Sequence, residues 1–442
     1  MAATLVVPVI INTSGSMPEG APAMSSAAAL FGAGIGTLVY LLFTRFKSPV
    51  FLGSSFAFIG SMCSAFAGAI SAQAGYLGLI IGAVCAGLVY VVIALIVKFA
   101  GVKWISKLMP AVVIGPTVAI IGLSLAGNAI GDLQTAPAGG SSYVAILCGL
   151  VTLAVTMLCA TFGKKMIRLI PFIMGILAGY AVAAIFTLIG NAAGIDALKV
   201  INFAPLTNLF TDFSIKSIVS VPDFTFVEAL KGIKDIDAAD IGTVAVAYAP
   251  VAFVVFAEHI ADHKNLSTII ESDLLEEPGL HNTLLGDGVG SMAGAFLGGC
   301  PNTTYGESVG CVAITGNASV ITILTTAVMA IVISFLAPFV AFVNTIPSCV
   351  MGGVCMALYG FIAVSGLKMI QKVDLEQNRN LFVVSVILIT GIGGLSVSYG
   401  KVTLTTIACA LILGILANVM LGVKDKKPAE EAPASEDNTY EL

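Results

Sequence analysis

The chain has 442 residues, of which 58% are hydrophobic and only 10% carry a charged side chain. Soluble domains carry about 25% charged residues, so this composition excludes an ordinary soluble protein and indicates a polytopic membrane protein. The formal net charge of −5 says little about partners, because much of it lies in the acidic C-terminal tail. The nine cysteines form no CxxC pair, and we expect them to be small buried hydrophobes rather than disulfides or metal ligands.

Apolar segments follow one another along almost the whole chain. The first, 1–12, would be about 18 Å long as a helix, against a membrane core of about 30 Å. It is therefore a half-span, unless the start codon is assigned too late. No basic region precedes it, so we do not expect a signal peptide. The thirteen further segments, which bring the count to fourteen, are 26–44, 49–71, 74–98, 105–127, 142–161, 168–192, 239–261, 281–299, 301–316, 318–343, 347–366, 380–397 and 403–422.

The positions of Lys and Arg predict the orientation in the membrane. Fifteen of the twenty basic residues fall in connections after even-numbered segments or in the tail, and five fall after odd-numbered segments. Basic residues favour the cytoplasmic side, so we expect a multi-pass protein of the cytoplasmic (inner) membrane with both termini cytoplasmic. The long polar stretch before the eighth segment is then extracellular, with a short surface helix predicted at 223–233.

A weak internal repeat relates the two halves of the chain. Pro110 and Gly115 in the fifth segment have the same spacing as Pro347 and Gly352 in the twelfth. The third segment (FLGSSFAFIG) and the tenth (CPNTTYGESVG) are both short and rich in Gly and Ser or Thr. Segments seven apart have opposite directions in a membrane, which is typical of the inverted repeats of secondary transporters. The predicted division is a first repeat, an extracellular loop, a second repeat and a disordered tail, at 1–192, 193–238, 239–422 and 423–442.

Two glutamates inside apolar segments are the first candidates for a functional site. Glu258 lies in VAFVVFAEHIAD and Glu307 in CPNTTYGESVGCVAITG. Carboxylates at membrane depth are costly and therefore indicate function. Asp262 follows Glu258 by four residues, so the two share a helix face, and in a low dielectric one of them tends to keep a proton. This pair is a natural element for proton coupling, unless Asp262 lies beyond the helix end in water.

Two histidines lie beside these carboxylates. His259 and His263 have the i, i+4 spacing that could bind one metal ion, but the sequence offers no third ligand and lacks the HExxH order. We expect His259 to be a hydrogen-bonded packing residue and His263 to lie past the helix end at the water interface. The third histidine, His281, lies at a predicted helix start and is expected at the surface.

The residues before Glu307 predict an irregular segment. Pro301 to Thr304 disfavour a helix, and Gly306 then opens a half-helix whose free N–H groups can donate to a ligand carbonyl. Phe56 would supply an N–H group and a stacking ring from the other half, and Tyr359 is a weaker candidate. A protonated carboxyl group offers one donor and one acceptor, which complements the N–H and C=O edge of a cyclic imide. An uncharged nucleobase therefore fits this chemistry.

At these residues the sequence resembles the uracil permease branch of the nucleobase–ascorbate transporter family. The resemblance lies in FLGSSFAFIG, VVFAEHIAD, PNTTYGESVGCVAITG and PSCVMGGVCMALYGFIAVSG. It implies an all-α membrane protein of fourteen segments in two inverted repeats, with core and gate domains and short strands in segments three and ten that cross at the site. It also implies proton-coupled uptake of a nucleobase by alternating access. The implied partners are uracil, protons and membrane lipid, with a possible homodimer, no nucleic acid, no cofactor and no enzymatic activity.

The resemblance also assigns roles to individual positions. Glu258 and Glu307 match the glutamates that hydrogen-bond the base, while Phe56, Gly306 and Tyr359 match residues around it. The residues assigned to proton coupling are Glu307 and Asp262. Asp262 stands where well-studied uracil permeases have histidine. Glu307 is usually Gln in the xanthine and urate branches, so it favours uracil, with a purine permease as the alternative. Two alternatives belong to other classes of protein: a metalloenzyme in the membrane, and a sensor that does not transport.

Overall fold

The computed structural model describes residues 2–422 except for 19, 68, 102–109, 138, 165, 212, 213, 400 and 401. Within helices and strands, the description omits the side chains of residues 2, 3, 13, 166, 169, 216, 307, 314, 399, 402 and 403. The predicted tail at 423–442 and the first residues of the segment predicted at 105–127 therefore lie outside the described residues.

Long apolar helices dominate the structure and make the chain a multi-pass membrane protein. Among the described residues, seven helical stretches are long and apolar enough to cross a membrane. The full count of fourteen segments stays a prediction. The seven stretches are α2 (Ser26–Phe43), α4 (Ala72–Ala100), α6 with α7 (Ala111–Ser124 and Ala126–Gln134), α8 (Ser142–Phe162), α10 (Pro171–Ala193), α13 (Ala238–Ile270) and α18 (Ser348–Ile370).

In the part of the chain that the structure describes, four strands and further helices, which are shorter or less apolar, complete the fold. The strands are β1 (Leu52–Ser54), β2 (Asn302–Thr304), β3 (Val397–Tyr399) and β4 (Val402–Leu404). The helices are α1 (Ala2–Thr13), η1 (Phe56–Phe58), α3 (Ile59–Ala67), α9 (Met166–Leu169), η2 (Asp196–Leu198), α11 (Ala204–Thr211), η3 (Ile215–Ser217), α12 (Thr225–Lys231), η4 (Leu275–Gly279), α14 (Leu280–Gly298), α15 (Gly306–Thr315), α16 (Val320–Ser334), α17 (Ala337–Thr345), α19 (Asn378–Ile392) and α20 (Thr406–Gly422).

Local sequence explains where the helices begin and end. Ser25 caps α2 and Ser71 caps α4, each accepting a hydrogen bond from a backbone N–H of the first turn. Asp237 and Asp240 form a reciprocal capping box at the start of α13. Gly299 ends α14 at a φ of 75°, a conformation that most side chains disfavour. These signals reproduce most of the predicted boundaries.

The structure also corrects several predicted segments. The segment predicted at 239–261 continues as α13 to Ile270, and Asp262 and His263 on this extension are buried inside the protein. The segments predicted at 105–127 and 318–343 are interrupted at Leu125 and around Phe335. A hairpin of β3 and β4 occupies the end of the segment predicted at 380–397 and the start of the next one. The short surface helix predicted at 223–233 is confirmed as α12.

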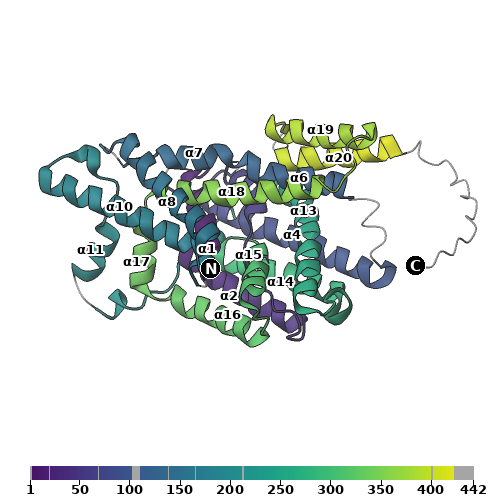
Figure 1. Ribbon diagram of the computed structural model, residues 1–442, viewed down its shortest axis with the longest axis horizontal. Coiled ribbons are helices and arrows are strands. Elements are labelled where there is room, and N and C mark those ends of the chain that lie inside the picture. Colours follow the sequence, from purple (N-terminus) through teal and green to yellow (C-terminus); the bar gives the residue numbers. More distant parts are fainter. Residues whose placement is uncertain are drawn as a thin grey trace, which may run out of the picture.

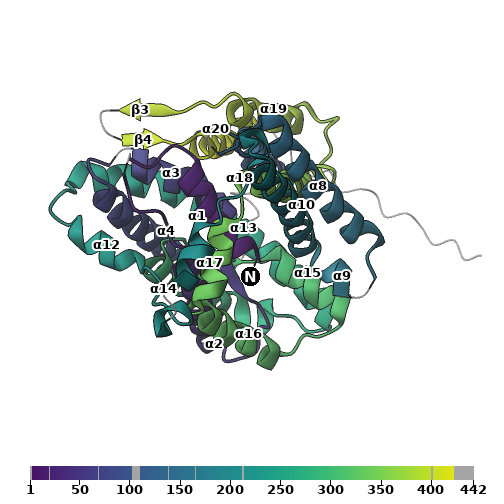
Figure 2. The same cartoon turned by 90° about the vertical axis from the view of Figure 1, so that its left-hand side faces the viewer.

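The helices pack in two groups, which Figure 1 shows on its lower and upper sides. The first group contains β1 and β2 and is called the strand-bearing group. In it, α14 packs against α2 and α4, and α13 packs against α4. In the second group, α18 packs against α6 and α8, α10 packs against α8, and α19 packs against α6 and α20. Seen after a quarter turn, the hairpin of β3 and β4 extends along the edge occupied by α19 and α20 (Figure 2).

The long connection between α10 and α13 touches several elements on its way. Its helix α11 packs against α17, and Val219 forms an isolated β-bridge with Leu336 at the junction of α16 and α17. Its helix α12 then packs against α4 and α14. The connection is therefore anchored along its course.

Candidate functional site

Two short strands from distant parts of the chain meet in the interior. β1 and β2 pair antiparallel, with Gly53 opposite Thr303. The Tyr305 hydroxyl donates to the carbonyl of Ser54 at 2.6 Å, and the Tyr305 ring occupies the space where a Cβ on Gly53 would stand. Glycine is therefore required at this crossing. The strands implied by the family resemblance in segments three and ten are confirmed.

Each strand leads directly into a helix, so two helix starts lie at the crossing. β1 is followed by η1, which begins at Phe56, and β2 is followed by α15, which begins at Gly306. Helix starts carry backbone N–H groups without intrahelical partners and favour a hydrogen-bond acceptor nearby. Helix α13 packs against both η1 and α15. The irregular predicted segments therefore meet on one side of α13.

The predicted site residues come together around α13. Asp262 on α13 is 8% exposed, and its Oδ1 lies 3.5 Å from the position of a Cβ built on Gly306. Phe56 and Tyr359, both buried, pack edge to face with ring centroids 6.3 Å apart. Tyr359 belongs to α18, so this contact also joins the two helix groups.

The two predicted glutamates differ in how far the structure describes them. Glu258 is half-buried on α13, one turn before Asp262. Position 307 is the second residue of α15, but its side chain lies outside the described part, so the role of Glu307 stays a prediction. Glu258 and Asp262 occupy one face of a continuous helix, as their spacing predicts.

The prediction that His263 lies at the water interface is wrong. His263 is 0% exposed, and Asp262 is also buried, because α13 continues for two more turns beyond them. The Tyr40 hydroxyl that contacts His263 comes from α2, far away in the sequence, and a local hydropathy pattern does not reveal such a partner. His281, the second residue of α14, is half-buried rather than fully at the surface.

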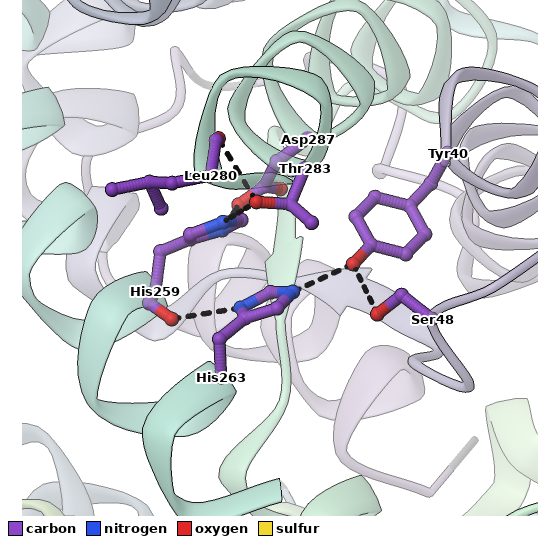
Figure 3. Close-up of polar contacts among 7 residues, drawn as sticks. All are labelled: Tyr40, Ser48, His259, His263, Leu280, Thr283 and Asp287. Atoms are coloured by element: carbon purple, nitrogen blue, oxygen red, sulfur yellow. Dashed lines mark hydrogen bonds and ion pairs between the residues drawn. The ribbon is translucent and has the colours of Figure 1, made fainter. Parts of the chain in front are cut away.

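A buried polar network connects α13 with α14 and α2, as Figure 3 shows. His259 contacts Asp287 through Nδ1 at 2.7 Å and Thr283 through Nε2 at 3.0 Å. His263 contacts the His259 carbonyl through Nδ1 at 2.8 Å, and its Nε2 lies 2.7 Å from the Tyr40 hydroxyl. The imidazole rings stack with centroids 4.0 Å apart. The expectation that His259 is a hydrogen-bonded packing residue is confirmed.

The network extends to the segment that enters β1. The Tyr40 hydroxyl lies 2.7 Å from the Ser48 hydroxyl, four residues before that strand. On the other arm, β2 packs against α14, the helix that carries Asp287. The helix that carries Glu258 and Asp262 is thus tied to both crossing strands. Such interhelical bonds fix one arrangement of the helices in a membrane protein.

Sequence reasoning missed four members of this network. Asp287 in LLGDGVG had a usable signal, since it is an ionisable residue inside an apolar segment. Tyr40, Ser48 and Thr283 had none, because such residues are common in membrane helices and their importance arises only from the tertiary contacts.

The histidine spacing does not create a metal site in this arrangement. Both ring nitrogens of His259 and both of His263 face hydrogen-bond partners. Within the ranges that the structure describes, no three His, Cys, Asp or Glu side chains gather closely enough to hold a metal ion.

The fold, the embedded carboxylates and the crossing strands define a membrane permease, and comparison with known proteins identifies its family. The sequence profile of the Permease family matches residues 1–399. The chain is 37% identical over 422 residues to the uracil permease of Bacillus caldolyticus, covering 95% of this chain and 88% of the relative. It is 38% identical to the uracil permease of Bacillus subtilis (strain 168), with 92% and 89% covered. The chain belongs to the nucleobase–ascorbate transporter family.

A further relative agrees with this assignment, and two solved structures share the fold. The uracil permease of Escherichia coli (strain K12) is 33% identical over 440 residues, with 98% of this chain and 92% of the relative covered. Among solved structures, the transmembrane domain of the cyanobacterial bicarbonate transporter BicA superposes with a TM-score of 0.58 at 17% identity, covering 94% of each chain. Murine Slc26a9, an anion transporter in the inward-facing state, also gives 0.58, at 13% identity with 95% and 65% covered. These two structures share the fold alone.

Proposed function

We propose that this protein takes up uracil across the cytoplasmic membrane together with protons, by alternating access. The observation that carries the proposal is the set of relatives named uracil permease, which are 33–38% identical over nearly the whole chain. Transport of a base also suits an embedded carboxylate, since Glu258 is half-buried on α13, a helix that packs against β2 and η1.

The proposed binding site consists of Glu258, Glu307, Phe56, Gly306 and Tyr359. A carboxyl group of Glu258 or Glu307 would pair with the N–H and C=O edge of uracil. The N–H groups at the start of α15 would donate to the second carbonyl, and Phe56 would pack against the ring. These interactions leave the substrate uncharged, which suits a site next to several carboxyl groups.

The proposed proton coupling uses Asp262 and Glu307. Asp262 lies beside the start of α15, so its charge acts on the same place where the base is expected to bind. Two nearby carboxyl groups in a low dielectric do not both ionise cheaply, so substrate binding and protonation would favour each other.

The proposed movement takes place between a core domain, corresponding to the strand-bearing group, and a gate domain, corresponding to the second group. The contact of Phe56 with Tyr359 supports this division, because the substrate-facing aromatic rings come from opposite groups. We further propose two inverted repeats of seven segments, cytoplasmic termini and a homodimer, on the grounds of the sequence pattern and the family.

Labelled uracil uptake in cells that lack their own uracil transporter tests the proposal. The assay includes a protonophore, unlabelled xanthine as competitor, and cells with empty vector as control. We expect saturable uptake that collapses with the protonophore and is unaffected by xanthine. Uptake of xanthine in place of uracil would instead indicate the purine alternative, and uptake insensitive to the protonophore would contradict proton coupling.

A further inference from the structure

The pair of His259 and Asp287 is the most deeply buried of the ion pairs that the structure describes. The side chains are 0% and 1% exposed, and Nδ1 of the histidine lies 2.7 Å from Oδ2 of the aspartate. The pair joins α13 to α14. The proposed transport site uses neither residue.

Hydrogen-bond directions at Thr283 restrict the protons that this pair can hold. The Thr283 hydroxyl has one hydrogen but lies 3.0 Å from two groups, Nε2 of His259 and the carbonyl oxygen of Leu280. The carbonyl can only accept. If Thr283 donates to Leu280, its oxygen accepts from an N–H at Nε2. If Thr283 donates to Nε2 instead, that nitrogen carries no hydrogen.

These two hydroxyl orientations correspond to two proton counts. With a hydrogen on Nε2, the short contact to Asp287 contains a second hydrogen, on Nδ1 or on Oδ2, and the pair is neutral overall. With Nε2 as acceptor, Nδ1 donates to an ionised carboxylate, and the pair carries one negative charge. The states differ by one proton, and no heavy atom has to move between them.

We propose that His259 and Asp287 form a proton-binding site, in which rotation of the Thr283 hydroxyl accompanies the gain or loss of one proton. The proton arrives at Nε2 from water, and the hydroxyl hydrogen turns from Nε2 towards the Leu280 carbonyl. The site deepens the proposed proton coupling, and its role in transport rests on that function.

The neighbouring histidine provides an internal contrast. The His259 carbonyl can only accept, so Nδ1 of His263 carries the hydrogen and its Nε2 accepts from the Tyr40 hydroxyl. Both partners are uncharged, and a proton added to His263 would be a buried charge facing uncharged groups, which is costly. We therefore expect His263 to stay neutral while His259 titrates, although the rings are stacked.

Other titratable groups surround the pair and will influence its midpoint. They are Tyr40 on α2, Tyr90 on α4, and Glu258, Asp262 and His263 on α13. The acidic groups favour uptake of a proton by the pair when they are ionised. Protonation of Asp262 during transport would therefore lower the proton affinity of the pair, which couples the two sites electrostatically.

The chain contains only three histidines, so nitrogen NMR of protein labelled with ¹⁵N-histidine in lipid bilayers can follow each ring. Without uracil, between about pH 5 and pH 8, we expect the His259 nitrogens to change with pH and those of His263 to keep one neutral pattern. His281→Asn identifies the third set of signals. A His259 spectrum that stays constant over this range would overturn the proposal.

Two variants locate the proton. Asp287→Asn should leave His259 neutral at every pH, whereas Asp196→Asn, which changes an exposed carboxylate next to Lys199, should leave the titration as in the unmodified protein. A His259 titration that persists in Asp287→Asn contradicts the shared site. Because these spectra require no substrate, a titrating His259 combined with uracil uptake that ignores a protonophore would refute the coupling and leave the proton site intact.

The hydroxyl rotation has its own test. Thr283→Val removes the acceptor for Nε2–H, so we expect the His259 midpoint to fall by about one pH unit, as loss of a charge-assisted hydrogen bond predicts. Thr156→Val is the matched control, because Thr156 is equally buried and bonds only to its own helix at Thr152. An unchanged midpoint in Thr283→Val contradicts the rotation step.

Discussion

The two helix groups bury polar side chains in different ways. In the strand-bearing group, polar side chains bond across helices, as His263 does to Tyr40 and His259 to Asp287. In the second group, several buried threonines such as Thr152 and Thr156 bond to carbonyls of their own helices, and Arg379 on α19 donates to Asn418 on α20. The first pattern fixes one relative position of the helices, and the second leaves apolar surfaces in van der Waals contact. Specific chemistry is therefore concentrated in the strand-bearing group.

Small residues let the helices of the second group pack closely. A Cβ on Gly179 of α10 would overlap Oγ1 of Thr152 on α8, and a Cβ on Gly353 of α18 would overlap the backbone of Gly149 on α8. Close approach of backbones gives these helices their stability in lipid. The two groups should therefore respond differently to the same kind of substitution.

Loss of a carboxylate in the strand-bearing group should have the largest effect. We expect Glu258→Gln to lower uracil uptake at low concentration by about 100-fold or more, because a charge-assisted hydrogen bond to the substrate is lost. Glu307→Gln should have the same result. Glu228→Gln on α12, which removes a surface ion pair with Lys231, is the control and should leave uptake unchanged. Normal uptake by Glu258→Gln would refute the site.

Asp262→Asn should change coupling more than binding. The amide cannot exchange a proton, so we expect accumulation driven by a proton gradient to fall about 10-fold, while exchange of labelled for unlabelled uracil without a gradient continues. Uptake is measured in vesicles at several external pH values. If the pH dependence of uptake is the same with and without the substitution, Asp262 is not part of the proton path.

A methyl group should disturb the second group through packing alone. Gly179→Ala places a Cβ against Oγ1 of Thr152, and we expect a loss of about 1–3 kcal/mol in the free energy of unfolding, typical of overpacking. Thr152→Ala in the same protein removes the obstructing atom and should restore most of the loss. A double variant as unstable as Gly179→Ala would contradict close packing between α8 and α10.

The same loss of a hydroxyl in the two groups gives a direct comparison. Tyr40→Phe leaves both His263 and Ser48 without their partner, so we expect it to cost about 1–3 kcal/mol and to raise the KM for uracil. Tyr180→Phe removes one bond to Thr345 between α10 and α17, and should cost about 0.5–1.5 kcal/mol without changing the KM. Equal effects on the KM would show that the network does not position the site.

The smallest effect concerns an exposed ion pair. Lys47, after α2, pairs with Glu277, between α13 and α14, and holds the pKa of that carboxyl group below its ordinary value. The stabilisation is therefore present above the unfolded pKa of Glu277 and is lost as the pH falls through the lowered folded value. Lys47→Gln should slightly reduce the thermal stability at neutral pH and weaken its decline in acid. High salt should remove the difference between the two proteins.

Sequence reasoning recovered most of the fold for a physical reason. Long apolar runs and cap residues such as Asp237 act locally, so most of the predicted segments correspond to observed helices. It failed at Asp262 and His263, which looked like the end of a helix in water but are buried. His263 bonds to Tyr40 on α2, which is far away in the sequence. The pairing of β1 with β2 came from family resemblance, because three-residue strands carry too little periodicity to predict.

The position of Glu258 along α13 has an electrical consequence. Glu258 lies twenty residues from Ala238 and twelve from Ile270, which correspond to about 30 Å and 18 Å along the helix axis. With the proposed orientation, the longer path faces the outside. A proton that enters from the outside and reaches Glu258 then crosses part of the membrane potential, and a charge that crosses all of it gains about 2.3 kcal/mol for each 100 mV. Membrane voltage should therefore act on the inward step of the cycle.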